Sequence, residues 1–277
     1  MPGKKAKSTG KKFCISIFQS LMKSVTLHLS PLEDKSSRKF QGEFERLYIK
    51  VREKEQRLYS DESLKKLPYV DRHHPHFEEW RSRNNSCKSF IRYLQKYRTP
   101  VSILEVGCGN GWLCNQISTM LGTDVTGIDV NRTEIEQAKR VFENDSNLRF
   151  YMADLQSECL MAKKFDIILF AASIQYFPSL SKVIDQSQSM LVPGGEIHII
   201  DSFFYEGEGA NLAKERTAHY YKSMGVPEMT HHYFHHKYEE LSPYSYVILK
   251  KPSRPWEKIW GANQVFPWIR IKSEVNA

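Results

Sequence analysis

The chain has 277 residues, which is enough for one large domain or two small ones with a packed core. With 40% hydrophobic and 26% charged residues, its composition argues against a disordered, a collagen-like or a multi-span membrane protein. The net charge of +8 is concentrated in residues 1–40, which hold nine Lys or Arg and two acids. The remaining residues carry 31 bases and 30 acids, so no nucleic-acid partner is expected.

The first 40 residues are expected to form a basic, disordered leader. Within them, an apolar residue recurs every four positions, as in a short amphipathic helix: Phe13, Ile17, Leu21 and Val25. Such a helix beside a lysine-rich tail would make weak contact with an anionic membrane surface. A poorly ordered leader without that role is the alternative, and the sequence favours it.

The cysteines indicate a reducing compartment. Five are scattered along the chain without a C-x-x-C pair, and an odd count does not suit a disulfide framework. The basic start is followed by neither a long apolar segment nor a small-residue cleavage site, which a secretory signal would require. A cytoplasmic location is therefore expected.

Two helices are predicted before Pro100. Apolar side chains follow the i, i+3, i+4, i+7 spacing of a helix after Gln41: Phe44, Leu47, Tyr48 and Val51. A second helix is expected over residues 77–97, with its apolar side chains on one side. Residues 41–99 would thus form a helical extension or lid, ahead of a main domain over 100–277.

From residue 100 on, short apolar strands alternate with helices, which indicates parallel pairing with right-handed crossovers. Strands are expected over residues 101–106, 124–129, 148–152, 165–171 and 196–201. Helices are expected between them over 111–121, 131–142 and 181–191, the last closed by Pro193-Gly194-Gly195. A helical insert is expected at about 202–240, followed by two final strands over 246–250 and 265–271.

A glycine-rich turn follows the first strand, with the sequence Leu104-Glu-Val-Gly-Cys-Gly-Asn-Gly111. Its glycines permit positive φ angles and a close approach of the backbone to a ligand. A dinucleotide-binding turn would need glycine or alanine where Trp112 stands, and no Lys-Ser/Thr pair follows as in a phosphate-binding loop. In an open α/β sheet, such a turn lies at the ligand-binding edge.

Two acidic residues end neighbouring strands at the same edge. Asp129 ends the second strand, 20 residues after Gly109, where a carboxylate can bind both hydroxyls of a ribose. Asp154 follows the third strand, where an acceptor can bind the exocyclic amine of an adenine. Taken singly, a strand-end aspartate is more often a cap or turn residue.

Together these motifs resemble the class I S-adenosylmethionine-dependent methyltransferases, closely over 100–202 and more loosely over 41–271. The resemblance implies a Rossmann-like, seven-stranded, mostly parallel sheet with helices on both faces and an N-terminal helical extension. It also implies S-adenosyl-L-methionine as methyl donor. The residues that it implies for binding this cofactor are Glu105, Gly107, Gly109, Gly111, Asp129, Val130, Asp154, Leu155 and Ala171.

The segment after the fourth strand bears on the reaction within this family. The residues Ala171-Ala172-Ser173-Ile174 lack both the Asn/Asp-Pro-Pro of enzymes that methylate amino groups and the carboxylates of Mg²⁺-dependent enzymes. A metal-independent reaction is therefore expected. Tyr176 follows, where many small-molecule methyltransferases place a residue beside the methyl group, although it can equally be a core aromatic residue.

The insert is rich in histidines, which leave three interpretations open. On a helix, His231/His235 and His232/His236 would form two i, i+4 pairs, a spacing that can bind a metal. A role in lining the pocket or as general base is favoured over plain packing, and packing over a metal site. The candidate catalytic residues are therefore Tyr176, His231 and His235, with no metal ligand assigned.

The sequence thus predicts methyl transfer to a small organic acceptor, apolar or aromatic because the insert is rich in aromatic residues. The acceptor could be oxygen, carbon or nitrogen. A protein or glycan methyltransferase and a non-catalytic cofactor-binding scaffold are the alternatives.

Overall fold

The computed structural model describes residues 35–97, 100–144, 146–252 and 266–273, with side chains from Gly42 on. Contacts divide the chain into residues 1–40 and 41–277, and the second unit is described here. Helix α2 (Lys35–Lys54) begins ahead of the predicted start at Gln41. The rest of the predicted basic leader, with its helix over 13–25, lies outside the described residues. In the described part of the chain, no helix is both long and apolar enough to cross a membrane.

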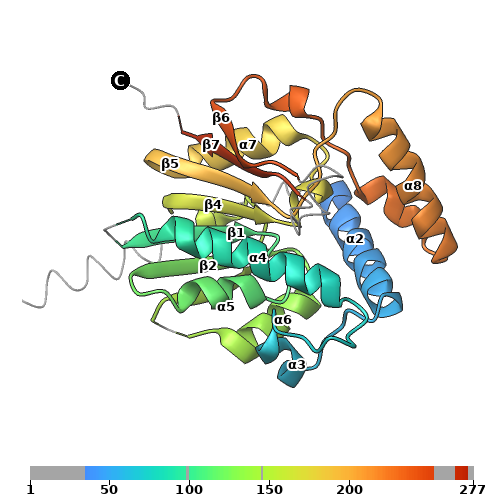
Figure 1. The fold of residues 1–277 in the computed structure, drawn as a ribbon, viewed down its shortest axis with the longest axis horizontal. Coiled ribbons are helices and arrows are strands. Elements are labelled where there is room, and N and C mark those ends of the chain that lie inside the picture. The colour runs from blue at the N-terminus through green and yellow to red at the C-terminus, as the bar shows by residue number, and fades with distance from the viewer. Residues whose placement is uncertain (1–34, 98–99, 145, 253–265, 274–277) are drawn as a thin grey trace, which may run out of the picture. The chain divides into compact units, whose positions relative to one another are not determined.

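A seven-stranded sheet forms the centre of this unit, in the order β3-β2-β1-β4-β5-β7-β6 (Figure 1). Strands β1 to β5 are parallel, whereas β7 runs antiparallel to both β5 and β6. The strands span Val101–Val106 (β1), Thr123–Asp129 (β2), Leu148–Met152 (β3), Phe165–Ala171 (β4), Leu191–Ile200 (β5), Tyr246–Lys250 (β6) and Trp268–Lys272 (β7). The predicted Rossmann-like fold class is confirmed.

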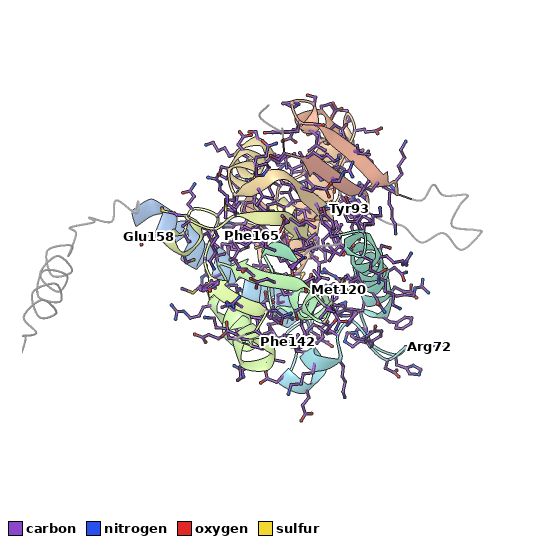
Figure 2. All side chains as sticks on the ribbon, turned by 90° about the vertical axis from the view of Figure 1, so that its left-hand side faces the viewer. Arg72, Tyr93, Met120, Phe142, Glu158 and Phe165 are labelled. Carbon is purple, nitrogen blue, oxygen red and sulfur yellow. The ribbon has the colours of Figure 1, made fainter. Side chains whose placement is uncertain are left out.

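Helices cover both faces of the sheet, and side chains fill the space between (Figure 2). On one face, α4 (Phe77–Leu94), α5 (Trp112–Ser118) and α6 (Arg132–Phe142) share a core with alternate residues of the strands. On the other face, α7 (Leu180–Ser189) packs with two short 3₁₀ turns, η1 (Glu158–Leu160) and η4 (Tyr238–Leu241). A short helix, α3 (Asp61–Lys66), was not predicted and joins the first core through Leu64.

The Pro193-Gly194-Gly195 segment does not close a helix, which corrects the sequence prediction. Helix α7 ends at Ser189 and β5 already begins at Leu191. Between the pairs Phe165↔Leu191 and Ile167↔Glu196 the register with β4 shifts, so the segment is a bulge within the strand. Gly194 takes φ +78° there with open space around its Cα, as expected of a bulge at the end of a sheet.

The insert after β5 contains α8 (Gly209–Ser223) and η3 (Pro227–His232). Figure 1 shows α8 beside α2, and a small apolar core joins them. That core contains Leu47 and Val51 of α2 together with Tyr221, Val226 and Met229. Both helices therefore border the carboxyl edge of the sheet, where the glycine turn lies.

Candidate active site

The glycine turn after β1 has a backbone conformation and close neighbours that leave no room for a side chain at Gly107 or Gly109. Gly107 and Gly109 have φ angles of +72° and +54°, in the left-handed region that favours glycine. A Cβ on Gly107 would lie 2.5 Å from the Cβ of Ser173, and one on Gly109 would lie 2.8 Å from Oε2 of Glu134. The turn is therefore held close both to the segment after β4 and to α6.

Asp129 at the end of β2 organises this turn. Its Oδ2 accepts a hydrogen bond from the backbone N–H of Gly109, and its Oδ1 accepts one from Asn131, both at 2.8 Å. Burial raises the pKa of Asp129, while the backbone donors of Asn131 and Gly109 lower it. The carboxylate predicted to bind a ribose thus contacts the glycine turn itself.

Two side chains of α6 place unpartnered polar atoms at the same point. Asn131 caps the helix as predicted, since its Oδ1 accepts from the backbone N–H of Glu134 at 3.1 Å. Both residues are buried, yet Nδ2 of Asn131 and Oε2 of Glu134 have no hydrogen-bond partner among the described residues. Burial raises the pKa of Glu134 to about 7. The sequence analysis missed this site role, because an acid at the third helical position ordinarily serves as a cap.

Helix α2 brings a tyrosine and an arginine to this site. The hydroxyl of Tyr48 accepts hydrogen bonds from Nε and Nη2 of Arg52, at 2.9 and 2.6 Å. Burial lowers the pKa of Arg52, but Tyr48 and Glu134 raise it, and the net effect is a raised pKa. Burial also raises the pKa of Tyr48 well above its usual value. The sequence indicated only the helical spacing of this segment and gave no signal for Arg52.

Glu105 lies buried in β1, just before the turn. The thiol of Cys114 donates a hydrogen bond to its Oε2 at 2.8 Å. Burial raises the pKa of this carboxyl to about 8, although Cys114 and Arg83 lower it. Arg83 of α4 also lowers the pKa of Glu134, so this guanidinium, which the sequence analysis missed, lies within electrostatic reach of both acids.

The other residues predicted to bind the cofactor lie at the ends of β2, β3 and β4. Asp154 follows β3, and its Oδ1 accepts from the backbone N–H of Gln156 at 2.9 Å and from the hydroxyl of Ser157 at 3.0 Å. Asp129 pairs with Met152 in the ladder, so the two acids end adjacent strands. Leu155 is buried, while Val130 and Ala171 are partly exposed. Their part in cofactor binding stays a prediction.

Tyr176 lies in η2 (Ile174–Tyr176) within a cluster of rings. Its ring centroid is 5.5 Å from that of Phe44 and 5.7 Å from those of Tyr48 and Tyr233. Burial raises its pKa. Tyr176 therefore joins α2, the segment after β4 and the insert, and its catalytic role stays a prediction.

The histidine pairs that a helix would form are absent, because η3 ends at His232 and the chain then becomes extended. His231 is exposed, and the Nε2 of His235 lies 2.9 Å from Oγ1 of Thr217. His236 is buried and donates from Nε2 to the carbonyl of Ile174 at 3.1 Å. Over the described residues, no three His, Cys, Asp or Glu side chains are grouped to hold a metal ion. The roles of His231 and His235 as bases stay predictions.

Comparison with known proteins agrees with this fold. Residues 103–195 match a family model described as a methyltransferase domain. A ubiquinone biosynthesis O-methyltransferase of Nitrobacter winogradskyi is 29% identical over 115 residues, which cover 41% of this chain and 44% of that protein. A 27-O-demethylrifamycin SV methyltransferase of Amycolatopsis mediterranei is 27% identical over 162 residues, covering 56% of this chain and 60% of that protein.

Among solved structures, the magnesium protoporphyrin IX methyltransferase of Synechocystis PCC 6803 superposes with a TM-score of 0.51. It is 14% identical, and the match covers 79% of this chain and 92% of that one. The chain spans less than half the length of the first curated relatives that it matches. Residues 103–195 are thus similar to a methyltransferase domain, and they lie within the sheet that carries the glycine turn.

Proposed function

We propose that this chain binds S-adenosylmethionine at the glycine turn and transfers its methyl group to a small organic acceptor. The observation that carries this proposal is the bond between Asp129 and Gly109 beside the unpartnered Oε2 of Glu134. Buried polar atoms ordinarily have partners, so this acceptor and the Nδ2 donor of Asn131 indicate a polar ligand. The methyl donor offers hydroxyl, ammonium and carboxylate groups that suit such atoms.

Each part of the site would then take one part of the donor. Asp129 would accept hydrogen bonds from the ribose hydroxyls, and Asp154 would accept one from the adenine amine. The glycine turn would approach the amino-acid end, with Glu105 close by. When bound, the donor supplies an activated methyl group, and the protein supplies position.

We propose that the acceptor is apolar or aromatic and that the reaction is metal-independent. The rings of Phe44, Tyr48, Tyr176 and Tyr233 meet beside the cofactor site, and their neighbour Tyr221 belongs to α8. Aromatic side chains are typical walls of pockets for such ligands. Two relatives are named for ubiquinone biosynthesis and for 27-O-demethylrifamycin SV, which supports a small-molecule acceptor.

We propose a cytoplasmic location as well, with the basic leader as a weak membrane contact. The four cysteines of the described residues are free thiols, as is usual in a reducing compartment. Cell fractionation with and without residues 1–40 would test both points. Recovery of the full-length protein in a secreted fraction would contradict the location.

The function itself is tested with isotope-labelled S-adenosylmethionine and a small-molecule extract of the host. The expected result is one labelled small compound, formed by the wild type and lost with Asp129→Ala. Label found only in macromolecules would instead support a protein or glycan acceptor. Absence of both labelling and cofactor binding would contradict the proposal.

A further inference from the structure

Helix α2 carries a polar stripe that faces the start of α6. Glu45, Tyr48 and Arg52 follow the i, i+3, i+7 spacing, which places them on one face of the helix. Oε1 of Glu45 accepts a hydrogen bond at 2.8 Å from the backbone N–H of Arg132, the first residue of α6. Glu134 lies in the same first turn of α6. This contact therefore places the polar stripe of α2 beside the helix that borders the glycine turn.

The start of α6 presents two buried polar atoms next to the glycine turn. Oε2 of Glu134 would lie 2.8 Å from a Cβ on Gly109, and Asn131 caps the same turn of the helix. Neither Oε2 of Glu134 nor Nδ2 of Asn131 has a hydrogen-bond partner among the described residues. Burial raises the pKa of both Glu134 and Asp129, and Arg52 lowers both, so its guanidinium lies within electrostatic reach of the two acids. Within the described part of the chain, however, no ion pair joins Arg52 to either acid.

The hydrogen-bonding groups of Arg52 are only partly used. Its Nε and Nη2 donate to the hydroxyl of Tyr48, at 2.9 and 2.6 Å. Its Nη1 lies 4.0 Å from Oε2 of Glu55, and that oxygen lies closer, at 3.1 Å, to Nε of Arg57. The Arg52 side chain is only 23% exposed, and over the described residues its Nη1 donates no hydrogen bond. A planar guanidinium with unused N–H groups is the usual protein partner of a carboxylate or a phosphate.

The chemistry of the methyl donor identifies the anion that suits this site. The carboxylate is the only anionic group of S-adenosylmethionine, and the ammonium is bonded to the same carbon atom. Such a zwitterionic end requires a cation and a hydrogen-bond acceptor close together. Arg52 supplies the cation, while Glu134 and Asn131 supply an acceptor and a second donor beside Gly109. The amino-acid end of the donor thus matches the charges that face the glycine turn.

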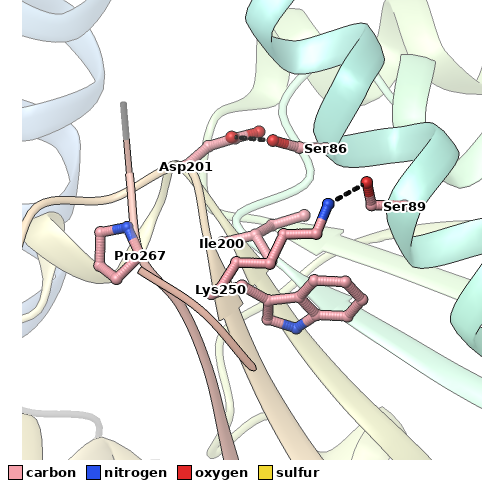
Figure 3. A pocket seen from close by; sticks show the side chains of 7 residues that line it. Ser86, Ser89, Ile200, Asp201, Lys250 and Pro267 are labelled. Carbon is pink, nitrogen blue, oxygen red and sulfur yellow. Dashed lines mark hydrogen bonds between the residues drawn. The ribbon is translucent and has the colours of Figure 1, made fainter. Parts of the chain in front are cut away.

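Two other cations near the carboxyl edge are less suited to a carboxylate. The charge of Arg83 is already paired, since its Nε donates to Oε1 of Glu79 at 2.9 Å. Lys250 faces a small polar cavity that Asp201 also lines (Figure 3). This cavity has a volume of about 10 Å³, room for a water-sized group only, and the charge of Asp201 would repel a carboxylate. Arg52 is therefore the cation best placed for the donor.

Arg52 also holds the part of α2 that would face the acceptor. Three rings of the proposed acceptor site, called the acceptor wall, are those of Phe44, Tyr48 and Tyr176. The ring centroid of Tyr48 is 5.6 Å from that of Phe44 and 5.7 Å from that of Tyr176. Since Phe44 and Tyr48 belong to α2, the acceptor wall is complete only while α2 lies against α6 and the segment after β4. The bond between Tyr48 and Arg52 joins this wall to the charge beside the glycine turn.

We infer that Arg52 binds the carboxylate of the methyl donor, and that the bound donor thereby fixes α2 together with the acceptor wall. The inference rests on the proposed function and adds an order to it, because the donor binds before the acceptor. Without an anion, the charge of Arg52 is weakly paired at a partly buried position, which disfavours the packing of α2. The carboxylate of the donor pairs with this charge, and the acceptor then meets a wall that is already in place.

Binding of two adenosine thioethers tests the contact with Arg52 without turnover. S-adenosylhomocysteine carries the amino-acid end, whereas 5′-methylthioadenosine lacks both its carboxylate and its ammonium. In calorimetry, Arg52→Met is expected to lose at least about tenfold in affinity for S-adenosylhomocysteine, as for a hydrogen bond to a charged group, and to bind methylthioadenosine as the wild type does. Arg52→Lys should retain part of the affinity, because the charge remains without the planar fork.

Two further variants make this test specific to Arg52. Arg46→Met is the matched control, because Arg46 lies exposed on the same helix, and it should bind both compounds as the wild type does. An equal loss of affinity for both compounds in Arg52→Met would mean a structural role and would overturn the inference. A selective loss for S-adenosylhomocysteine in Arg83→Met, with normal binding in Arg52→Met, would place the carboxylate at Arg83 and would overturn it as well.

Hydrogen exchange tests whether the bound donor fixes α2. In the wild type, S-adenosylhomocysteine is expected to slow the exchange of backbone amides over residues 42–54, and methylthioadenosine should slow it far less. Helix α7, on the opposite face of the sheet, is the internal reference and should not change. The effect on α2 should be lost in Arg52→Met at the same degree of saturation. Unchanged exchange of α2 in the wild type saturated with S-adenosylhomocysteine would overturn the inference.

The wild type alone separates this inference from the proposed function. If it binds neither compound, the proposed function fails. If it binds both compounds with equal affinity, the adenosine part of the site stands and only the inference about Arg52 fails.

Discussion

The backbone N–H of Gly109 donates a hydrogen bond to Oδ2 of Asp129, 20 residues further along the chain, at 2.8 Å. This bond links the turn after β1 to the end of β2, so the position of the carboxylate and the shape of the turn depend on each other. A ligand bound by Asp129 is thereby brought against the glycine turn. The remaining features of the proposed cofactor site, from α6 and α2, are arranged around this link.

Substitution of Gly107 by alanine should destabilise the fold more than the same change at Gly194. Both glycines have a left-handed φ, at +72° and +78°, which costs an alanine about 1–2 kcal/mol. A Cβ on Gly107 would also lie 2.5 Å from Cβ of Ser173, and overpacking adds about 1–3 kcal/mol. Gly194 has open space, so Gly194→Ala is the matched control. Equal unfolding free energies of Gly107→Ala and Gly194→Ala in denaturant would show that the turn accommodates the Cβ of residue 107 without strain.

Glu134→Gln should stabilise the protein in alkaline solution. Burial raises the folded-state pKa of Glu134 to about 7, above the unfolded value of about 4.3, so stability falls as the pH rises from about 4.3 to 7. Glu134→Gln carries no charge to bury, so its unfolding free energy should exceed that of the wild type by about 1–3 kcal/mol at pH 8. At pH 4 the two unfolding free energies should differ little. Thermal unfolding at the two pH values measures the difference. A variant less stable than wild type at pH 8 would contradict the cause assigned to the pKa.

Glu196 should stabilise the contact between α4 and the sheet. Its Oε2 accepts hydrogen bonds from the hydroxyls of Tyr93 and Tyr97, at 2.5 and 3.0 Å, and from Nε2 of His198 at 3.1 Å. Burial alone would raise the pKa of Glu196, but the hydrogen bonds from His198 and Tyr93 outweigh burial and lower the pKa to about 2. Since this lies below the unfolded value, the stabilisation is complete above about pH 4.5 and is lost as the pH falls toward 2.

Glu196→Gln is therefore expected to lose about 1.5–3 kcal/mol of unfolding free energy at pH 7, as for hydrogen bonds to a charged group. The difference in unfolding free energy between wild type and Glu196→Gln should become smaller in acid, where the wild-type carboxylate is protonated. Tyr97→Phe removes one donor and should cost less. A loss independent of pH would show that the charge of Glu196 contributes nothing.

His236 and His231 should differ in stability. His236 is buried and bonded to the carbonyl of Ile174, so His236→Ala should cost about 1–3 kcal/mol by leaving that carbonyl without its donor. His231 is exposed, and His231→Ala should change stability by less than about 0.5 kcal/mol. Chemical denaturation measures both. A large effect at His231 would indicate a contact that the structure does not contain.

The strands and the glycine turn were predictable because their signals are local. The alternation of strands and helices, the glycine turn, the cap at Asn131 and the two strand-end acids each depend on neighbouring residues. The bulge at Pro193 was missed, because a proline-glycine segment is typical of turns outside a strand. The histidine pairs, which the spacing would form only on a helix, do not form, and nothing local shows that η3 ends at His232.

The other side chains of the site could not be predicted, since packing brings them together. Arg52 reaches Tyr48 on its own helix, but its effect on Glu134 depends on how α2 lies against the sheet. Glu45 of α2 meets the backbone of Arg132 across 87 positions. In the sequence both Arg52 and Glu45 are ordinary charged residues of a surface helix. Their meaning depends on tertiary contacts that no spacing encodes.

Titration calorimetry with S-adenosylhomocysteine tests the central claim most directly, that Asp129 and the glycine turn bind the methyl donor. The wild type is expected to bind one molecule per chain, and Asp129→Ala should lose about 1.5–3 kcal/mol of binding, or about 10- to 150-fold. Asp124→Ala is the matched control, because Asp124 lies exposed on the same strand. Absence of binding by the wild type, or full affinity in Asp129→Ala, would contradict the account.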